Sequence, residues 1–292
     1  MLAVSLSDKA NVVKRESQEA TIRTLKYQET AKHDLEKKVQ ERTEELNKYV
    51  NTLKKDLQMA NSIQLNIIPK EFLFLNSFNV YSKYIPLDKV GGDFYDIFEF
   101  NQNKIRLFIA DATGHGVQAA LVTMSIKSEY DSLKSIILQP SELLEELNLR
   151  FKDIYKNIKV YFSAVVLDLD LLNNKLTYSS AGHPDQFLIR EKEIIPLRRT
   201  NRIMGLSIAS DFVDKEIDFY KEDKIILFTD GIFEQFNDSR EQYGDVRLKE
   251  KVLANLNSSV QTIVSEILQD LEEFVGEKEK QDDITIIGVE CT

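Results

Sequence analysis

The sequence predicts an α+β domain preceded by one long helix. Residues 1–68 contain neither glycine nor proline, and the first proline is Pro69. Because both residue types interrupt helices, their absence over this stretch predicts a long helix. After Pro69, short runs rich in β-branched and aromatic residues predict strands, and Asn173-Asn174 between two of them predicts a hairpin. The helical patterns that follow come in pairs, which favours a layered α+β domain over a regular βαβ alternation.

The first 68 residues carry the apolar spacing of a coiled coil. From residue 46 the apolar positions step by four and three, at Leu46, Val50, Leu53, Leu57 and Ala60. The pattern extends back through Thr43 and Val39 and slips at Leu35, which we interpret as a stutter. A parallel dimer that transmits a signal is the functional interpretation, and an antiparallel hairpin folded on itself is the alternative.

Composition excludes several classes of protein. A net charge of -10 and a pI near 5.0 argue against a duplex-binding module, so no nucleic-acid partner is expected. The single cysteine, Cys291, excludes a disulfide scaffold and a cysteine-built zinc site. No apolar run approaches the ~18 residues that a membrane span needs. The short apolar start, Met1–Leu6, is either the remnant of a membrane exit in a longer parent chain or a frayed terminus.

Strands and helices are expected at definite positions after Pro69. The expected strands are Phe78–Tyr84, Lys104–Ala110, Tyr161–Leu169, Lys175–Ser180, Gln186–Arg190, Lys224–Thr229 and Ile284–Glu290. The expected helices are Val117–Leu133, Glu142–Tyr155, Arg247–Leu256 and Val260–Val275. Pro140-Ser141 just before Glu142 is a typical helix start.

The candidate chemistry lies in aspartates placed where strands begin or end. Four apolar segments carry them, at Asp93, Asp111, Asp230 and the pair Asp282-Asp283. An aspartate at the tip of a buried strand is unfavourable unless a turn, a cation or water satisfies it. Carboxylates gathered at one end of a sheet would form an oxygen-rich site suited to Mg²⁺ or Mn²⁺. Two such ions close together can activate water for attack on phosphorus.

Each motif alone also has a simpler explanation. Asp-Gly is a common turn dipeptide, and the segment Gly114-His115-Gly116 is either a phosphate-binding helix start or a tight turn. His183 is interpreted as a structural turn residue. Gly91-Gly92-Asp93-Phe94 resembles the diguanylate cyclase signature but lacks its second consecutive acid, and Asp168-Leu169-Asp170 resembles a haloacid dehalogenase motif but lacks its threonine. Without a G-x-x-x-x-G-K-[ST] loop, a P-loop ATPase is not expected.

Taken in order, the motifs resemble those of one family. The chain is similar to the PPM-type metal-dependent serine/threonine phosphatases, in the bacterial branch of the stage II sporulation protein E phosphatase domain. The resemblance covers about Gln64 to Glu290. The matching segments are Gln64–Pro69, Val90–Asp96 with the GGDFYD box, the DxxGHG box Asp111–Gly116, Ala181–Pro184, the TDG box Thr229–Gly231 and the DDxT box Asp282–Thr285.

The resemblance implies a fold and a set of ligands. The fold would be an α-β-β-α sandwich of two antiparallel sheets flanked by helices, with residues 1–68 as a coiled-coil linker and 69–292 as the phosphatase domain. Two divalent ions, Mn²⁺ or Mg²⁺, would activate a hydroxide that hydrolyses phosphoserine or phosphothreonine. The implied metal ligands are Asp93, Asp111 as the bridging carboxylate, the carbonyl of Ala112, Asp230 and Asp282, with Asp283 a weaker candidate. Asp111 and His115 are the implied catalytic residues, His115 as a proton donor to the leaving group.

The resemblance also implies partners. These are a phosphorylated protein substrate, typically a STAS-type anti-sigma-factor antagonist, and a second copy of the chain joined through the coiled coil. A cytoplasmic location is expected, with an upstream membrane sensor absent from this chain. Because every implied ligand position keeps its carboxylate, we expect an active enzyme. The alternatives are a catalytically weak, phosphatase-like scaffold that dimerises and binds a phosphoprotein, and a structural coiled-coil spacer.

Overall fold

The chain is described by a computed structural model over residues 2–114, 116–156, 158–206 and 211–292. Its internal contacts divide it into two units, Met1–Asp56 and Leu57–Thr292. The predicted domain boundary is 68/69, whereas the last turns of the first helix belong to the second unit. The assignment of a linker role and a phosphatase role to the two parts stays a prediction.

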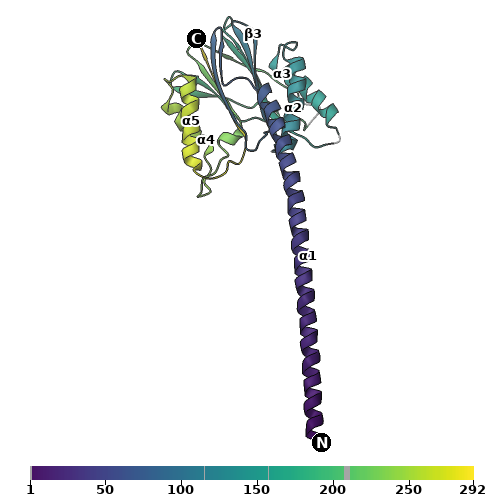
Figure 1. The fold of residues 1–292 in the computed structure, drawn as a ribbon. Coiled ribbons are helices and arrows are strands. Elements are labelled where there is room, and N and C mark those ends of the chain that lie inside the picture. The colour runs from purple at the N-terminus through teal and green to yellow at the C-terminus, as the bar shows by residue number, and fades with distance from the viewer. Residues whose placement is uncertain (1, 115, 157, 207–210) are drawn as a thin grey trace. The chain divides into compact units, whose positions relative to one another are not determined.

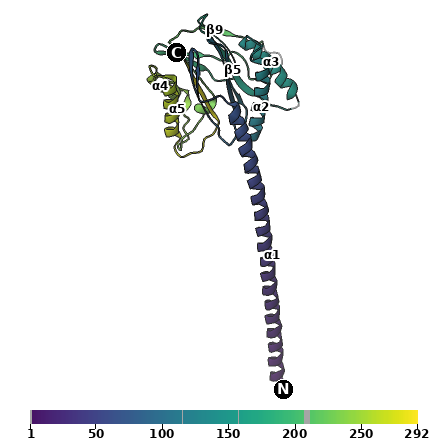
Figure 2. The same ribbon diagram turned by 45° about the horizontal axis from the view of Figure 1, so that its top comes forward.

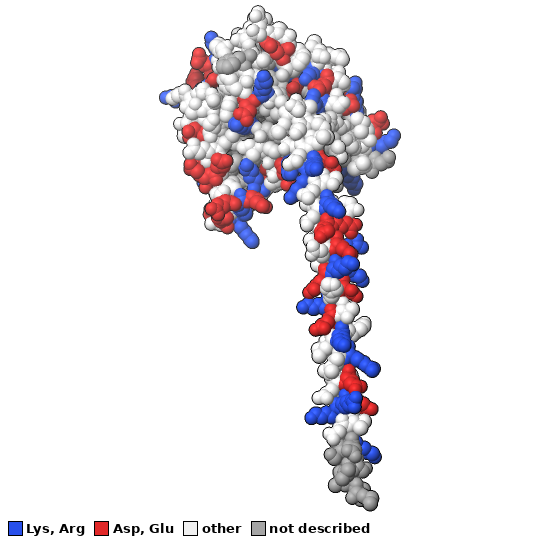
Figure 3. Space-filling view, viewed as in Figure 1, with Lys and Arg blue, Asp and Glu red and all other residues white. Residues whose placement is uncertain are grey.

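Helix α1 (Leu2–Ile67) is a single continuous helix, which at ~1.5 Å per residue is about 100 Å long. Lysine, arginine, aspartate and glutamate alternate along its surface (Figure 3). Its apolar side chains are exposed, for example Leu46 at 62% and Leu53 at 59%. Because the helix contains no turn, the alternative of an antiparallel hairpin is wrong. Dimerisation through this apolar stripe stays a prediction.

The second unit contains two antiparallel sheets. Sheet A has the order β1-β2-β11-β10-β7-β8, and sheet B has the order β3-β4-β5-β6-β9. The strands of sheet A are β1 (Phe72–Leu75), β2 (Phe78–Ile85), β7 (Gln186–Arg190), β8 (Glu193–Leu197), β10 (Lys224–Phe228) and β11 (Ile284–Cys291). Those of sheet B are β3 (Asp93–Asn101), β4 (Lys104–Ala112), β5 (Phe162–Asp170), β6 (Lys175–Ala181) and β9 (Lys215–Asp218).

Helices cover the outer face of each sheet, so the unit has four layers (Figures 1 and 2). Helices α2 (Gly116–Leu133) and α3 (Pro140–Ile154) pack on sheet B, and α4 (Gly244–Ala254) and α5 (Val260–Val275) pack on sheet A. Three apolar clusters hold the layers together, one between the sheets and one under each helix pair. The expected α+β class and the α-β-β-α layering are confirmed.

Four strands of the described structure were not predicted from the sequence: β1, β3, β8 and β9. Strands β1 and β9 have only four residues each, too few for a periodic pattern to show. Strand β8 contains Pro196, which is compatible with its position at the edge of sheet A. Strand β3 begins directly at Asp93, immediately after Gly91-Gly92, a dipeptide that is typical of a turn and not of a strand.

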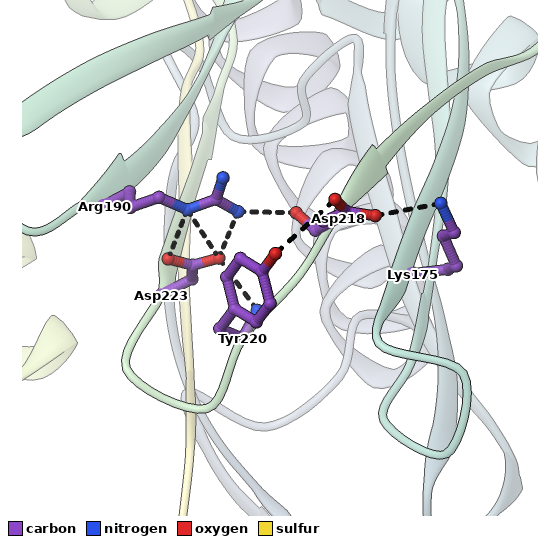
Figure 4. A network of polar contacts seen from close by, with 5 residues as sticks. All are labelled: Lys175, Arg190, Asp218, Tyr220 and Asp223. Carbon is purple, nitrogen blue, oxygen red and sulfur yellow. Dashed lines mark hydrogen bonds and ion pairs between the residues drawn. The ribbon is translucent and has the colours of Figure 1, made fainter.

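One end of the sandwich is held together by a polar network (Figure 4). Arg190 of β7 binds the Asp223 carboxylate and the backbone carbonyl of Asp218. Lys175, the first residue of β6, binds the Asp218 carboxylate at 2.9 Å. The network therefore joins the two sheets where β6 and β10 begin. The opposite ends of these strands carry the candidate site.

Within the described parts of the chain, no helix is both long enough and apolar enough to cross a membrane.

Candidate active site

The predicted acidic residues meet at one end of the sandwich because of the strand register. Asp93 begins β3 and lies directly opposite Asp111 near the end of β4. In sheet A, β10 ends at Phe228 just before Asp230, and β11 begins at Ile284 just after the pair Asp282-Asp283. Antiparallel pairing of β10 with β11 brings these two ends together.

Asp93 is the most buried carboxylate of the group, with 1% of its surface exposed. Its Oδ2 accepts hydrogen bonds from the hydroxyls of Thr229 at 2.8 Å and Thr285 at 2.6 Å. The two threonines stand at the ends of β10 and β11, so they fix a sheet B carboxylate to sheet A. Burial, and next the Asp283 carboxylate, raises the pKa of Asp93 well above its usual range, against the effect of the two hydroxyls.

Asp111 and Asp230 face other carboxylates. Burial first, and then Asp93 and Asp230, raise the pKa of Asp111 to about 10. Burial, followed by Glu234 and Asp282, raises the pKa of Asp230 to about 6. Like charges close together disfavour ionisation of one another, and a divalent cation between them would reverse this effect.

Asp283 is bound to backbone and organises the glycine-rich loop. Its Oδ1 accepts from the N–H of Leu87 at 2.7 Å, and its Oδ2 accepts from the N–H of Gly92 at 2.5 Å. Both carboxylate oxygens therefore hold the loop that leads into Asp93. These two hydrogen bonds give Asp283 a role in positioning Asp93, which was not predicted from the sequence.

Two glycines allow the close approach of these segments. A Cβ at Gly92 would lie 2.8 Å from the carbonyl oxygen of Ala112, the expected backbone ligand. A Cβ at Gly231 would lie within 2.8 Å of the Asp283 carbonyl carbon and closer still to its oxygen. Any side chain at either position would push the strand ends apart.

Of the two histidines in the motifs, His115 and His183, the structure describes only His183. His115, the expected proton donor, lies outside the described residues. His183 is 1% exposed, and its Nε2 lies 3.2 Å from the carbonyl oxygen of Phe228. Because a carbonyl only accepts, Nε2 carries the proton and Nδ1 accepts from the Ser163 hydroxyl at 2.6 Å. His183 therefore links the ends of β5 and β10 as a neutral ring.

The donor set is the kind that hard divalent cations prefer. Buried carboxylates that raise one another's pKa, together with a backbone carbonyl held against a glycine, are oxygen ligands for Mg²⁺ or Mn²⁺. Within residues 2–114, 116–156, 158–206 and 211–292, however, no three His, Cys, Asp or Glu side chains converge tightly enough to hold an ion by themselves. The carboxylates share one neighbourhood, and their roles as ligands are a proposal.

Three further functional contacts were not anticipated from sequence. These are the hydroxyl bonds of Thr229 and Thr285 to Asp93, and a buried double hydrogen bond between Gln64 and Gly91. Thr229 and Thr285 lie inside the TDG and DDxT boxes, and Gln64 begins the first matching segment. The motifs therefore contain these residues, but the sequence does not show which groups they contact.

The family follows from comparison with known proteins. Residues 101–292 match the model of the family described as Stage II sporulation protein E (SpoIIE). Since this match covers more than half of the chain, the chain belongs to the SpoIIE family. The resemblance expected from the motifs is confirmed.

Named relatives support this placement. The chain is 26% identical over 243 residues to the phosphoserine phosphatase RsbU of Bacillus subtilis (strain 168), covering 80% of this chain and 70% of RsbU. It is 25% identical over 215 residues to the phosphoserine phosphatase RsbP of the same organism, covering 70% of this chain. The chain spans about half of RsbP, 53% of its length.

Solved structures share the fold. The SiaA-PP2C domain of Pseudomonas aeruginosa superposes with a TM-score of 0.74 and 22% identity, over 82% of this chain and 96% of that chain. The fold of the second unit is thus that of PP2C phosphatase domains.

Proposed function

We propose that the chain is a metal-dependent phosphoprotein phosphatase that hydrolyses phosphoserine or phosphothreonine. The observation that carries the proposal is the placement of Asp93 opposite Asp111, with Asp230 and Asp282 close enough to raise the pKa of Asp111. Membership of the SpoIIE family and the relatives named phosphoserine phosphatases support it.

The proposed ligands of two divalent ions, Mn²⁺ or Mg²⁺, are Asp93, Asp111, the carbonyl of Ala112, Asp230 and Asp282. The chemistry that such ions supply at a carboxylate site is the activation of water for attack on phosphorus. The chain's own residues prepare the site. Two threonine hydroxyls orient Asp93, and the Asp283 carboxylate holds the loop that precedes it.

The finer proposal concerns the substrate and the assembly. The family resemblance implies a phosphorylated STAS-type anti-sigma-factor antagonist as substrate, and the exposed apolar stripe of α1 supports a homodimer. A long exposed apolar stripe is unfavourable in water, and pairing with a second helix would bury it.

The test is hydrolysis of p-nitrophenyl phosphate with Mn²⁺ added and with chelator present. We expect turnover only with metal, and its loss in Asp111→Asn and Asp230→Asn. Full activity in chelator, or in both variants, would refute the proposal. Phosphate release from phosphorylated STAS proteins then tests the substrate, and sedimentation at micromolar concentration tests the dimer.

A second candidate is a catalytically weak scaffold that dimerises and binds a phosphoprotein. It is favoured by one observation, that no three candidate ligands converge among the described residues. Tight binding of a phosphorylated partner without phosphate release, in the presence of Mn²⁺ and Mg²⁺, would support the scaffold over the enzyme.

A further inference from the structure

Residues 198–206 cross from sheet A to sheet B at the end of the sandwich that holds the carboxylates. The segment leaves β8 after Leu197, which pairs with Gln186 at the start of β7. It then bridges to the last residue of β6, through Asn201, and to the first residue of β5, through Met204. Each of these strand ends lies at the same end of the sandwich as Asp230.

Hydrogen bonds fix the backbone of this segment. The N–H of Arg199 donates to the Asp185 carboxylate at 3.0 Å, and the N–H of Asn201 donates to the Ser180 carbonyl at 2.8 Å. Farther along, the N–H of Gly205 donates to the side chain of Asn148 at 2.8 Å. Side chains carried by this segment therefore start from fixed positions, which lowers the entropic cost of binding a ligand.

Three arginines project from the fixed segment: Arg198, Arg199 and Arg202. All three are exposed. In the described part of the chain none of them forms an ion pair, although most other arginines of the second unit are bound to carboxylates, such as Arg106 to Asp168. In a chain with a net charge of -10, three unpaired guanidinium groups within five consecutive positions form a local basic surface.

This basic surface borders a pocket that reaches the candidate active site. The pocket has a volume of about 380 Å³, and both Arg199 and Asp230 line it. Its apolar wall is made by Phe187, Phe228 and Phe233. Acidic residues line it as well: Glu234 lies close enough to Asp230 to raise the pKa of that carboxyl, Asp185 accepts the Arg199 N–H, and Asp245 is paired with Lys249 at 2.8 Å. Among the described residues that line the pocket, Arg199 is the basic side chain that has no ion pair, since Lys249 is bound to Asp245.

We propose that Arg198, Arg199 and Arg202 bind acidic residues that flank the phosphoserine of the protein substrate. This inference rests on the proposed function and names the substrate class that the site prefers. A phosphoserine placed at Asp230 would lie beside the pocket that Arg199 also lines, and Arg198 and Arg202 are one and three positions from Arg199 in the sequence. Guanidinium groups bind carboxylates in a planar, two-bond geometry, and complementary charge discriminates among partners. The same arginines also offset the repulsion between an acidic substrate and an acidic protein.

The experiment compares two synthetic phosphoserine peptides on the full chain with Mn²⁺. One peptide carries glutamates on both sides of the phosphoserine, and the other carries glutamines at the same positions. We expect kcat/KM to be about ten-fold higher for the glutamate peptide at low salt, as for a few partly screened charge pairs. In Arg199→Glu/Arg202→Glu this preference falls to one or reverses, and in wild type it shrinks as salt is added.

The matched control is Lys192→Glu/Lys221→Glu, which makes the same change of net charge on exposed lysines at the other end of the sandwich. It keeps the ten-fold preference if the arginines act locally. The inference is overturned if wild type shows no preference, if the arginine variant keeps it, or if the control loses it equally. Absence of metal-dependent p-nitrophenyl phosphate hydrolysis in wild type would instead defeat the proposed function. Fluorescence anisotropy of the two labelled peptides still measures the preference in that case.

Discussion

Gln64 and Gly91 are joined by two hydrogen bonds. The side-chain Nε2 of Gln64 donates to the Gly91 carbonyl at 2.7 Å, and its Oε1 accepts from the Gly91 N–H at 3.0 Å. Gln64 lies in the last turn of α1 and is 3% exposed. Its amide thus satisfies both backbone groups of a residue two positions before Asp93. The end of the long helix is fixed to the loop that positions a proposed ligand.

Removal of this contact is expected to weaken the metal site. In Gln64→Ala, two buried backbone groups lose their partners, at a cost of about 1–3 kcal/mol in the free energy of unfolding. We also expect a higher Mn²⁺ concentration for half-maximal hydrolysis of p-nitrophenyl phosphate, because the loop before Asp93 is less well fixed. Urea denaturation and a metal titration measure the two effects. Gln58→Ala, at an exposed position of α1, is the control. Equal metal dependence in both variants would contradict the prediction.

Loss of the charge at Asp111 is expected to stabilise the metal-free protein while abolishing activity. The pKa of Asp111 is raised in the fold, so the folded state holds a proton that the unfolded state releases above pH about 4. Stability of the metal-free protein therefore falls as pH rises through the range between these two pKa values. Asp111→Asn mimics the neutral form, so it should raise the free energy of unfolding at pH 7.5 by on the order of 1 kcal/mol or more.

Urea denaturation in chelator, with and without later addition of Mn²⁺, measures this effect. Wild type gains stability from Mn²⁺ and Asp111→Asn gains less, since a ligand that binds only the folded state stabilises it. Asp153→Asn, at an exposed position of α3, controls for the change of net charge. A metal-free Asp111→Asn protein less stable than wild type would show that burial of the Asp111 charge, together with its repulsion by the neighbouring carboxylates, does not destabilise the fold.

The buried ion pair of Arg106 and Asp168 is expected to carry a large share of the stability of sheet B. Arg106 is fully buried, and its two bonds to Asp168 are 2.6 and 2.8 Å long. Its remaining donors bind the carbonyls of Lys134, Ile137 and Leu138, beyond the end of α2. Arg106→Leu leaves a buried carboxylate and three carbonyls without partners, so we expect a loss of about 3–5 kcal/mol.

The comparison is Lys175→Met, which removes an exposed ion pair to Asp218 in the network of Figure 4. Exposed pairs contribute little because solvent screens them, so this variant should unfold at nearly the wild-type urea concentration. Similar losses in both variants would mean that burial does not distinguish the two pairs.

Sequence alone located the carboxylates but not what orients them. Asp93 and Asp111 could be predicted as neighbours of strand ends, because apolar runs and glycines mark those ends. That Asp93 and Asp111 lie directly opposite each other depends on the register of β3 and β4, and a slip of one residue would separate them. The positioning roles of Thr229 and Asp283 depend on contacts between sheets far apart in sequence, for which periodicity carries no signal.

Burial of a neutral His183 is expected to make the fold sensitive to acid. Burial lowers the pKa of His183 to about 3, and the hydrogen bond to the Phe228 carbonyl opposes this only in part. In the unfolded chain the ring titrates near pH 6.5, so between these values the unfolded state binds the additional proton. The free energy of unfolding therefore falls as pH is lowered below about 6.5, by up to about 1.4 kcal/mol per pH unit.

In His183→Gln, whose amide carries a donor and an acceptor but does not titrate, this contribution is absent. Urea denaturation of both proteins in chelator at pH 7.5, 6.5 and about 5.5 isolates it, because the carboxylates contribute equally to each. We expect the difference in stability between wild type and variant to shrink or reverse in favour of the variant as pH falls. A difference that stays constant over this range would show that the folded and unfolded chains bind the proton on this ring equally, so that burial does not lower its pKa.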